Sequence, residues 1–155
     1  MNRPVPQAPT NLGTMTQKAS AIWTGSLKDG QGSISTGSGA LHAKPYSFRT
    51  RFEGEPGTNP EELIGAAHAG CFSMALSMIL GLAGLTPDKI ETTATITLEK
   101  KDDGFAITAS HLDVLAAVPG ATEEVFQDLA AKAKAGCPVS KLLNATITMD
   151  AKLLT

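Results

Sequence analysis

Cysteine is scarce in this sequence, and the two that occur lie far apart. Cys71 and Cys137 are the only cysteines among 155 residues, too few for the disulfide framework of a small secreted domain and too widely spaced for a zinc knuckle. In a reducing compartment, such a pair is typical either of free buried thiols or of a redox couple. Permanent disulfide support of the fold is therefore not expected.

Basic runs and an apolar leader are also missing. Thirteen Lys and Arg against fifteen Asp and Glu give a formal net charge of -2. No cluster of positive charge could neutralise a row of phosphates, so we expect no nucleic-acid partner. The N-terminal stretch 1–17 contains no apolar segment of the kind that directs secretion, which predicts a cytoplasmic location.

The longest apolar stretch covers residues 67–85, and polar residues interrupt it. His68, Ser73 and Ser77 lie within it, so it falls short of the roughly 20 apolar residues that cross a bilayer. We interpret it as a core helix and expect no membrane association. Why the most apolar segment of the chain carries His68 and Cys71 one helical turn apart is the question that the sequence raises.

The length and composition are those of one globular domain. Hydrophobic residues make up 42% and charged residues 18% of the chain, which is ordinary for a folded protein. Residues 1–14 contain Pro4, Pro6 and Pro9 and little that could be buried. We therefore expect residues 1–14 to form a flexible extension ahead of a single domain over residues 15–155.

Short β-like segments separated by turn residues fill the first third of this domain. Three segments have this pattern: residues 19–27, 32–42 and 45–53. They predict three antiparallel strands. In the third, an alternation of period two would place Tyr46, Phe48 and Phe52 toward the core. Its arginines, Arg49 and Arg51, would then lie on the opposite face.

Helix signals begin at Asn59 and return later in the chain. Asn59 can cap a helix, Pro60 fits the first helical position, and Glu61 lies where the helix dipole favours an acid. We expect this helix to run to about Ala83. The later elements predicted are a hairpin of residues 90–100 and 104–118, a helix over 122–136, a helical turn over 137–143 and a strand over 144–153. This order favours an α+β fold over βαβ winding.

The residues with chemical potential each allow more than one interpretation. A cysteine such as Cys71 in an apolar helix usually behaves as a small hydrophobic residue, whereas Cys137, just before Pro138, could cap a helical turn where a thiolate is favoured. His68 could form a nucleophile pair with Cys71 or bond to a backbone carbonyl. His42 and His111 lie in strand-like segments without nearby ligand residues, so we expect no metal site.

The two cysteine-containing motifs, taken together, are specific for one protein family. The peptide TRFEGEPGTNPEELIGAAHAGCFSMALSMILGLAGLTP, followed by TTATITL, GFAIT and AKAGCPVSKLL, resembles the OsmC family of osmotically inducible, thiol-dependent organic hydroperoxide reductases, which is related to the Ohr proteins. The resemblance extends from about residue 15 to residue 153. It implies an OsmC-like α+β fold, in which antiparallel sheets surround a long cysteine-bearing helix, and an intertwined homodimer.

The resemblance also assigns roles to four residues. Cys71 matches the peroxidatic nucleophile, Cys137 the resolving thiol, Arg51 the active-site arginine and Glu61 the carboxylate that orients this arginine. The thiolate of Cys71 would attack the O–O bond and become a sulfenic acid, which Cys137 would convert to a disulfide. An arginine suits the site because it keeps its charge even when partly buried.

The resemblance implies a partner but no metal or organic cofactor. In the related Ohr proteins a protein-bound dihydrolipoyl group delivers the electrons, so the resemblance implies that an external dithiol returns the disulfide to the dithiol. The apolar residues around Cys71 favour an organic hydroperoxide over H2O2. Ten positions separate Glu61 from Cys71, or about 15 Å along a straight helix, so we expect Glu61 to serve the site of the second subunit.

Two functions of other classes stay open on the sequence alone. A non-enzymatic redox switch or stress-binding protein could use the same disulfide to change its partner contacts. A hydrolase could be built on Cys71 and His68. Turnover of peroxide separates the first from a peroxidase, and ester cleavage without oxidation of the cysteine identifies the second.

Overall fold

The structure is a computed structural model that describes residues 13–154. The predicted flexible extension, residues 1–14, therefore lies almost wholly outside the described residues. The chain divides into two compact units, one ending at Gly57 and the other running from Thr58. The expectation of a single domain over residues 15–155 stays a prediction.

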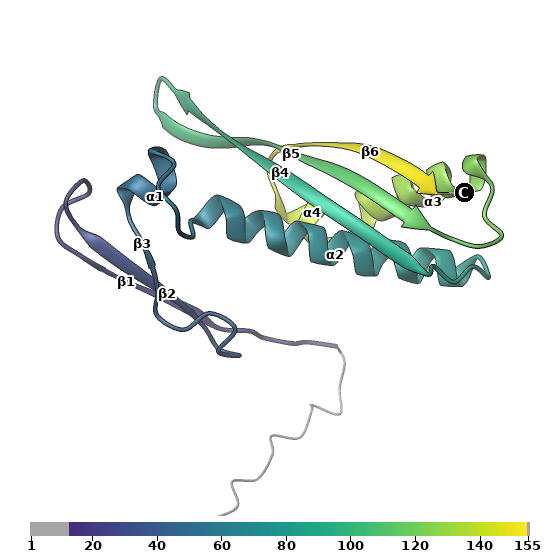
Figure 1. The fold of residues 1–155 in the computed structure, drawn as a ribbon, viewed down its shortest axis with the longest axis horizontal. Helices are drawn as coiled ribbons and strands as arrows, with labels where there is room; N and C mark the ends of the chain where they lie inside the picture. The colour runs from purple at the N-terminus through teal and green to yellow at the C-terminus, as the bar shows by residue number, and fades with distance from the viewer. Residues whose placement is uncertain (1–12, 155) are drawn as a thin grey trace, which may run out of the picture. The chain divides into compact units, whose positions relative to one another are not determined.

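The first unit contains the three-stranded antiparallel meander that the sequence predicts (Figure 1). Its strands are β1 (Ala19–Thr24), β2 (Gln31–Thr36) and β3 (Lys44–Tyr46), in the order β1-β2-β3. The rings of Trp23 and Tyr46 lie 5.5 Å apart between centroids. A Cβ on Gly32 would come within 2.4 Å of the Tyr46 ring and 2.7 Å of the Trp23 ring, so only glycine allows this aromatic packing across β2.

The third predicted strand ends early, and the segment with the two arginines is a helix. Helix α1 covers Phe48–Phe52. Ser47 caps it by accepting a hydrogen bond from the Thr50 backbone N–H at 3.3 Å, and the Thr50 hydroxyl accepts one from the Ser47 N–H at 2.9 Å. This reciprocal capping box fixes helical backbone angles. The Phe48 and Phe52 rings, four residues apart, then pack at 4.9 Å, so the predicted separation of aromatic and arginine faces along a strand is wrong.

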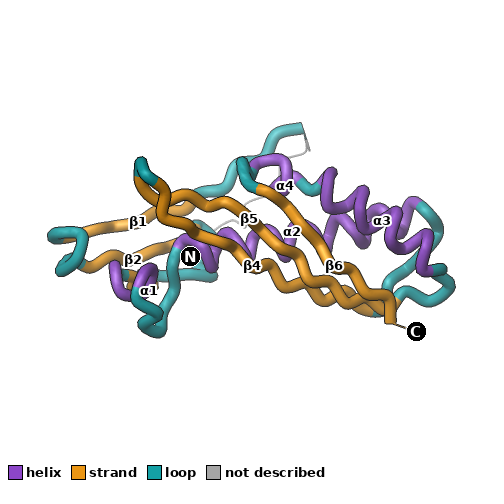
Figure 2. Tube along the Cα trace, turned by 90° about the horizontal axis from the view of Figure 1, so that it is seen from above, coloured by secondary structure: helices purple, strands orange, loops and turns teal. Residues whose placement is uncertain are grey.

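The second unit is built on a three-stranded sheet. Strands β4 (Lys89–Lys101) and β5 (Gly104–Ala117) form the predicted antiparallel hairpin, and β6 (Thr146–Leu154) pairs with β5 in parallel. Figure 2 shows the three strands side by side, with the helix that precedes β6 next to them. The parallel pair requires a crossover connection, so this part of the chain is one β-α-β unit within an otherwise antiparallel α+β fold.

Two helices and a helical turn cover one face of this sheet. They are α2 (Pro60–Leu82), α3 (Glu123–Gly136) and α4 (Pro138–Leu142). Asn59 caps α2 by accepting from the Glu62 N–H at 2.8 Å, and Thr122 caps α3, as the sequence predicts. The core beneath them joins Phe72, Leu76 and Leu80 of α2 to β5 and α3.

Helix α2 is the element that carries Cys71, and it differs between its two sides. Its buried residues recur at helical spacing: Glu61, Gly65, His68, Phe72, Leu76 and Leu80. By length and composition alone α2 could cross a membrane, with a mean hydropathy of 1.7 over 18 residues, but core helices pass the same test. Its buried carboxyl and imidazole groups and its packing on β4 are typical of a core helix.

Candidate functional site

The two cysteines, 66 positions apart in the sequence, meet in the second unit. Cys71 lies in the middle of α2, and Cys137 is the residue that ends α3 and caps α4. Their sulfurs are 2.8 Å apart and both are free thiols. Cys71 is partly exposed, whereas Cys137 is fully buried. Within the described residues, Cys71 therefore has some surface open to solvent, whereas Cys137 has none.

The surroundings of the two thiols differ electrostatically. Burial raises the pKa of Cys71, the contact with Cys137 raises it further, and the Val139 backbone N–H opposes both. Burial also acts to raise the pKa of Cys137, but hydrogen bonds from Cys71, from the N–H and hydroxyl of Ser140 and from the Val139 N–H outweigh it and lower the pKa. These N–H groups belong to the first turn of α4, where backbone donors are free.

The two sulfurs titrate as one system because they are in contact. In the neutral pair, the Cys137 thiol donates a hydrogen bond to the Cys71 sulfur. When the pair loses one proton, the donors around Cys137 favour the charge there, and Cys71 keeps the remaining proton. A thiolate at Cys71 therefore needs an additional positive charge near it.

His68 is not placed as the base of a Cys-His pair. Its side chain is fully buried, with Nδ1 2.7 Å from the Ser110 Oγ of β5 and Nε2 2.8 Å from the Ser140 Oγ of α4. Burial lowers the pKa of His68, so the imidazole is neutral. Both ring nitrogens are occupied by serine hydroxyls, and the hydrolase built on His68 and Cys71 loses its geometric basis.

Glu61 and Arg51, the other two residues that the resemblance assigns, belong to different units. Glu61 lies in the first turn of α2 and is only 9% exposed, at the helix end where the dipole favours a carboxylate. Arg51 lies in α1, with its guanidinium carbon 5.1 Å from the centre of the Phe52 ring. Their roles stay predictions.

An apolar hollow in the first unit has Arg51 in its lining. Its volume is about 280 Å³. It is lined by Trp23, Leu27, Tyr46, Ser47, Phe48, Arg51 and Phe52. A hollow with aromatic walls and one guanidinium suits an organic group that carries a polar or charged end. The sequence did not indicate this hollow, because it depends on the helix that replaces the expected strand.

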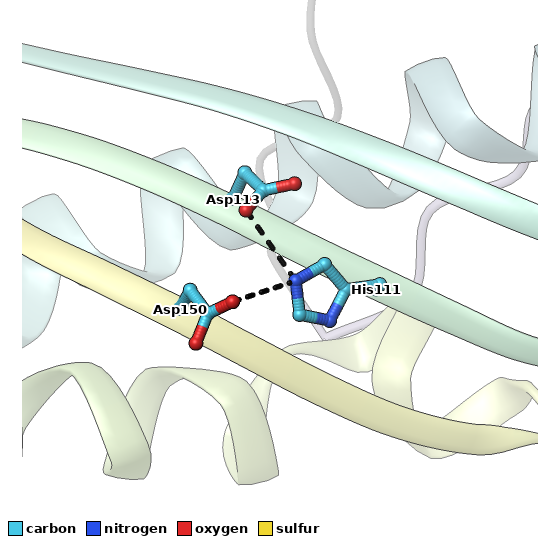
Figure 3. A group of neighbouring side chains, drawn as sticks. All are labelled: His111, Asp113 and Asp150. Atoms are coloured by element: carbon cyan, nitrogen blue, oxygen red, sulfur yellow. Dashed lines mark ion pairs between the residues drawn. The ribbon is translucent and has the colours of Figure 1, made fainter.

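One group of side chains in the second unit has the composition of a metal site. His111 and Asp113 of β5 and Asp150 of β6 offer ligand atoms within 4.8 Å of one another, and Figure 3 shows the imidazole Nε2 facing both carboxylates, at 3.4 and 3.3 Å. The Thr148 hydroxyl lies 2.6 Å from Nδ1. Both carboxylates are largely exposed, and exposed acidic groups commonly gather beside a histidine at a protein surface without holding a metal.

Comparison with known proteins identifies the family and the fold. The family model described as OsmC-like protein matches residues 52–152. The chain is 58% identical to the peroxiredoxin OsmC of Escherichia coli (strain K12) over 90% of this chain and 98% of that protein. It is 28% identical to the organic hydroperoxide resistance protein OhrB of Bacillus subtilis (strain 168), over 79% and 88% of the two chains. The crystal structure of an OsmC-like protein from Mycoplasma pneumoniae superposes with a TM-score of 0.71 at 14% identity, covering 91% of this chain and 99% of that one.

Proposed function

This chain belongs to the family of OsmC-like proteins, and from that premise we propose that it is a cysteine-based peroxidase that reduces organic hydroperoxides with Cys71 and Cys137. The observation that carries the proposal is the contact of the two sulfurs at 2.8 Å, with Cys71 partly exposed and Cys137 buried. A disulfide needs about 2.0 Å between sulfurs. Both thiols can therefore join with little movement of the helices that carry them.

The difference in exposure supports the two roles that we propose for the cysteines. The Cys71 thiolate attacks one oxygen of the hydroperoxide, the O–O bond breaks, and the alkoxide leaves with a proton as an alcohol. Cys71 is now a sulfenic acid. The Cys137 sulfur then attacks the Cys71 sulfur, the S–O bond breaks, and hydroxide leaves with the proton of Cys137 as water. Cys137 needs no access to solvent for this step.

Arg51 is proposed as the cation that the first step requires. Within the second unit, the negative charge of the singly deprotonated thiol pair lies preferentially on Cys137. Attack by Cys71 therefore requires a positive charge that stabilises a thiolate at Cys71. A guanidinium can stabilise both this thiolate and the developing alkoxide. The hollow that Arg51 lines has an aromatic surface, which would favour an organic hydroperoxide over H2O2. Glu61 would orient Arg51.

The reductant is proposed to be a dithiol. A thiol reductant is required by the chemistry, since two electrons must return to the disulfide after each turnover. A dihydrolipoyl group is the specific donor that we propose, because its two thiols can release a cyclic disulfide without a second reductant molecule. No metal or organic cofactor takes part in the proposed cycle.

A homodimer is proposed from the exposed face of α2. Met74, Met78 and Leu82, spaced by four, are 78%, 63% and 83% exposed. A helix that is apolar on all sides is normally buried on all sides, yet only 28% of the apolar window of α2 is buried within the chain. A second copy of α2 would cover this face, and α2 would then be the core helix of a soluble, cytoplasmic protein. Met78→Glu should shift the protein to monomer in light scattering, whereas Val125→Glu on α3 should not.

Peroxide consumption with a dithiol donor tests the proposed function. Cys71→Ser should abolish turnover of cumene hydroperoxide, and Cys137→Ser should accumulate a trappable sulfenic acid at Cys71. Arg51→Ala should slow the attack on peroxide far more than Arg49→Ala, since the Arg49 side chain is 66% exposed and only 3.8 Å from the Glu55 carboxylate. If Cys71→Ser turned over peroxide as fast as the parent, the peroxidase mechanism would be wrong.

The same assay separates a peroxidase from a redox switch. An enzyme consumes many equivalents of peroxide per chain in the presence of the dithiol. A switch consumes one equivalent and then stays oxidised until it is reset. Cleavage of ester substrates at a comparable rate, without loss of free thiols, would instead support a hydrolase.

A further inference from the structure

A chain of hydrogen-bonded side chains, buried at Ser110 and His68 and partly buried at Ser140, runs from β5 toward the resolving thiol. It begins at the Ser110 hydroxyl, passes through the two nitrogens of His68 at 2.7 and 2.8 Å, and reaches the Ser140 hydroxyl. Ser140 lies three residues after Cys137, in the first turn of α4, and its hydroxyl and backbone N–H lower the pKa of the Cys137 thiol. Buried polar groups are costly unless satisfied, and three elements contribute to satisfying these: β5, α2 and α4.

We propose that His68 is a positioning residue for the resolving step, in that it holds the Ser140 hydroxyl on the Cys137 sulfur. This inference rests on the proposed function. His68 is fully buried and does not bond to Cys71, so its action on the thiols passes through Ser140. This positioning role explains why an imidazole lies in the most apolar segment of the chain.

The chemistry of a neutral imidazole makes it suited to this task. It has one N–H donor and one acceptor nitrogen. When Nε2 carries the proton, it donates to the Ser140 oxygen, and the hydroxyl proton of Ser140 is free to point at a Cys137 thiolate. When Nε2 is bare, the Ser140 hydroxyl donates to it, and the Ser140 oxygen can accept from a Cys137 thiol. The two arrangements match the two protonation states through which Cys137 must pass.

The need arises in the second step of the cycle. Cys137 must lose its proton as it attacks the sulfenic acid of Cys71, and the released hydroxide takes up a proton to leave as water. The groups that act on Cys137 are Cys71 from α2 and the Val139 and Ser140 donors of α4. Of the α4 donors, only the Ser140 hydroxyl can reverse its hydrogen bond when Cys137 changes its charge, because the N–H groups only donate.

Rapid quenching after one equivalent of cumene hydroperoxide, followed by intact-mass analysis, separates sulfenic acid from disulfide. Ser140→Ala should slow disulfide formation about tenfold, the loss of one hydrogen bond to a charged group, and shift its pH profile upward. Ser140→Thr keeps the hydroxyl and should restore both. Equal rates and pH profiles for Ser140→Ala and the parent would overturn the inference.

Two amide variants of His68 provide the matched comparison. His68→Gln keeps an N–H near the Nε2 position and should resolve within about twofold of the parent. His68→Asn keeps a polar atom only near Nδ1, toward Ser110, and should resolve as slowly as Ser140→Ala. The double variant His68→Asn/Ser140→Ala should be no slower than Ser140→Ala alone, since both changes remove the same interaction.

The outcomes distinguish the inference from the function on which it rests. If the parent protein formed no sulfenic acid at Cys71, the proposed function itself would be wrong. A parent that forms it, with His68→Asn and His68→Gln slowed equally, would overturn only the positioning role and leave His68 as a structural residue. If the His68 variants do not fold, Ser140→Ala and Ser140→Thr decide alone.

Discussion

Oxidation of the thiol pair should stabilise the protein by an amount that the chain itself sets. A Cys71-Cys137 disulfide would close a loop of 66 residues. In the chain-entropy model, a loop of this length removes unfolded-state entropy worth about 4 kcal/mol at 25 °C. The sulfurs are already 2.8 Å apart in the reduced protein, so little strain should offset this gain.

The expected change is large enough to measure directly. For a chain of this size, each kcal/mol shifts the melting temperature by about 3 °C, which predicts a rise of about 12 °C on oxidation. Residual structure in the unfolded chain would reduce the gain, and we expect at least about half of it to remain. Reduced and oxidised protein should be compared by calorimetry at equal protein concentration, because an oligomer makes the transition depend on concentration.

The controls decide what a shift means. Cys71→Ser and Cys137→Ser treated with the same single equivalent of peroxide cannot form the crosslink and should show no rise. Intact mass and non-reducing electrophoresis should confirm one disulfide within each chain. If that disulfide were present and the oxidised protein melted at the same temperature as the reduced one, bridging would require local unfolding around α4, and the reasoning from sulfur proximity would be refuted.

Three other predictions follow from single positions. Burial lowers the pKa of His68 from 6.5, so the unfolded state binds a proton more readily than the folded state. The free energy of unfolding should therefore fall as the pH decreases below about 6.5, by up to about 1.4 kcal/mol per pH unit. Urea titrations at several pH values measure this dependence, and His68→Gln should remove it. Phe72→Ala, at a fully buried core position, should cost about 3–5 kcal/mol; Val125→Ala, on the exposed side of α3, is the control and should cost under about 1 kcal/mol. Thr122→Ala removes the α3 cap and should cost about 1 kcal/mol by the same titration, whereas Thr122→Ser should be near neutral.

Local sequence signals predicted most of the second unit. Asn59, Pro60 and the acids that follow them are sufficient to start a helix, and the long apolar segment sustains it to its observed end. The hairpin of β4 and β5 follows from alternation on both sides of a turn. These elements were predictable because each is specified by residues near one another in the chain.

The sequence did not predict elements for which two local patterns compete, or contacts between residues that are distant in the sequence. Period two in residues 45–53 favoured a strand, but Ser47 and Thr50 form a capping box and produce α1 instead. The expectation that His111 has no ligand residue nearby is wrong, because Asp113 lies two residues further along β5, and Asp150 reaches His111 because β6 pairs in parallel with β5. Ser140 gained significance from a contact with His68 over 72 positions, which no local pattern contains.

The proposed chemistry is divided between the two units in a way that follows from what each can supply. The second unit holds both sulfurs, the buried donors on Cys137 and a rigid core, all of which serve the exchange of one bond for another within the protein. The first unit holds an arginine on a short capped helix beside an aromatic hollow, which serves the recognition of an outside molecule. The thiol pair alone favours its charge on the buried sulfur, the one that peroxide cannot reach. In the mechanism that we propose, oxidation of Cys71 would therefore depend on the Arg51 guanidinium, and this dependence would keep the thiol pair reduced until a hydroperoxide and the guanidinium act on it together.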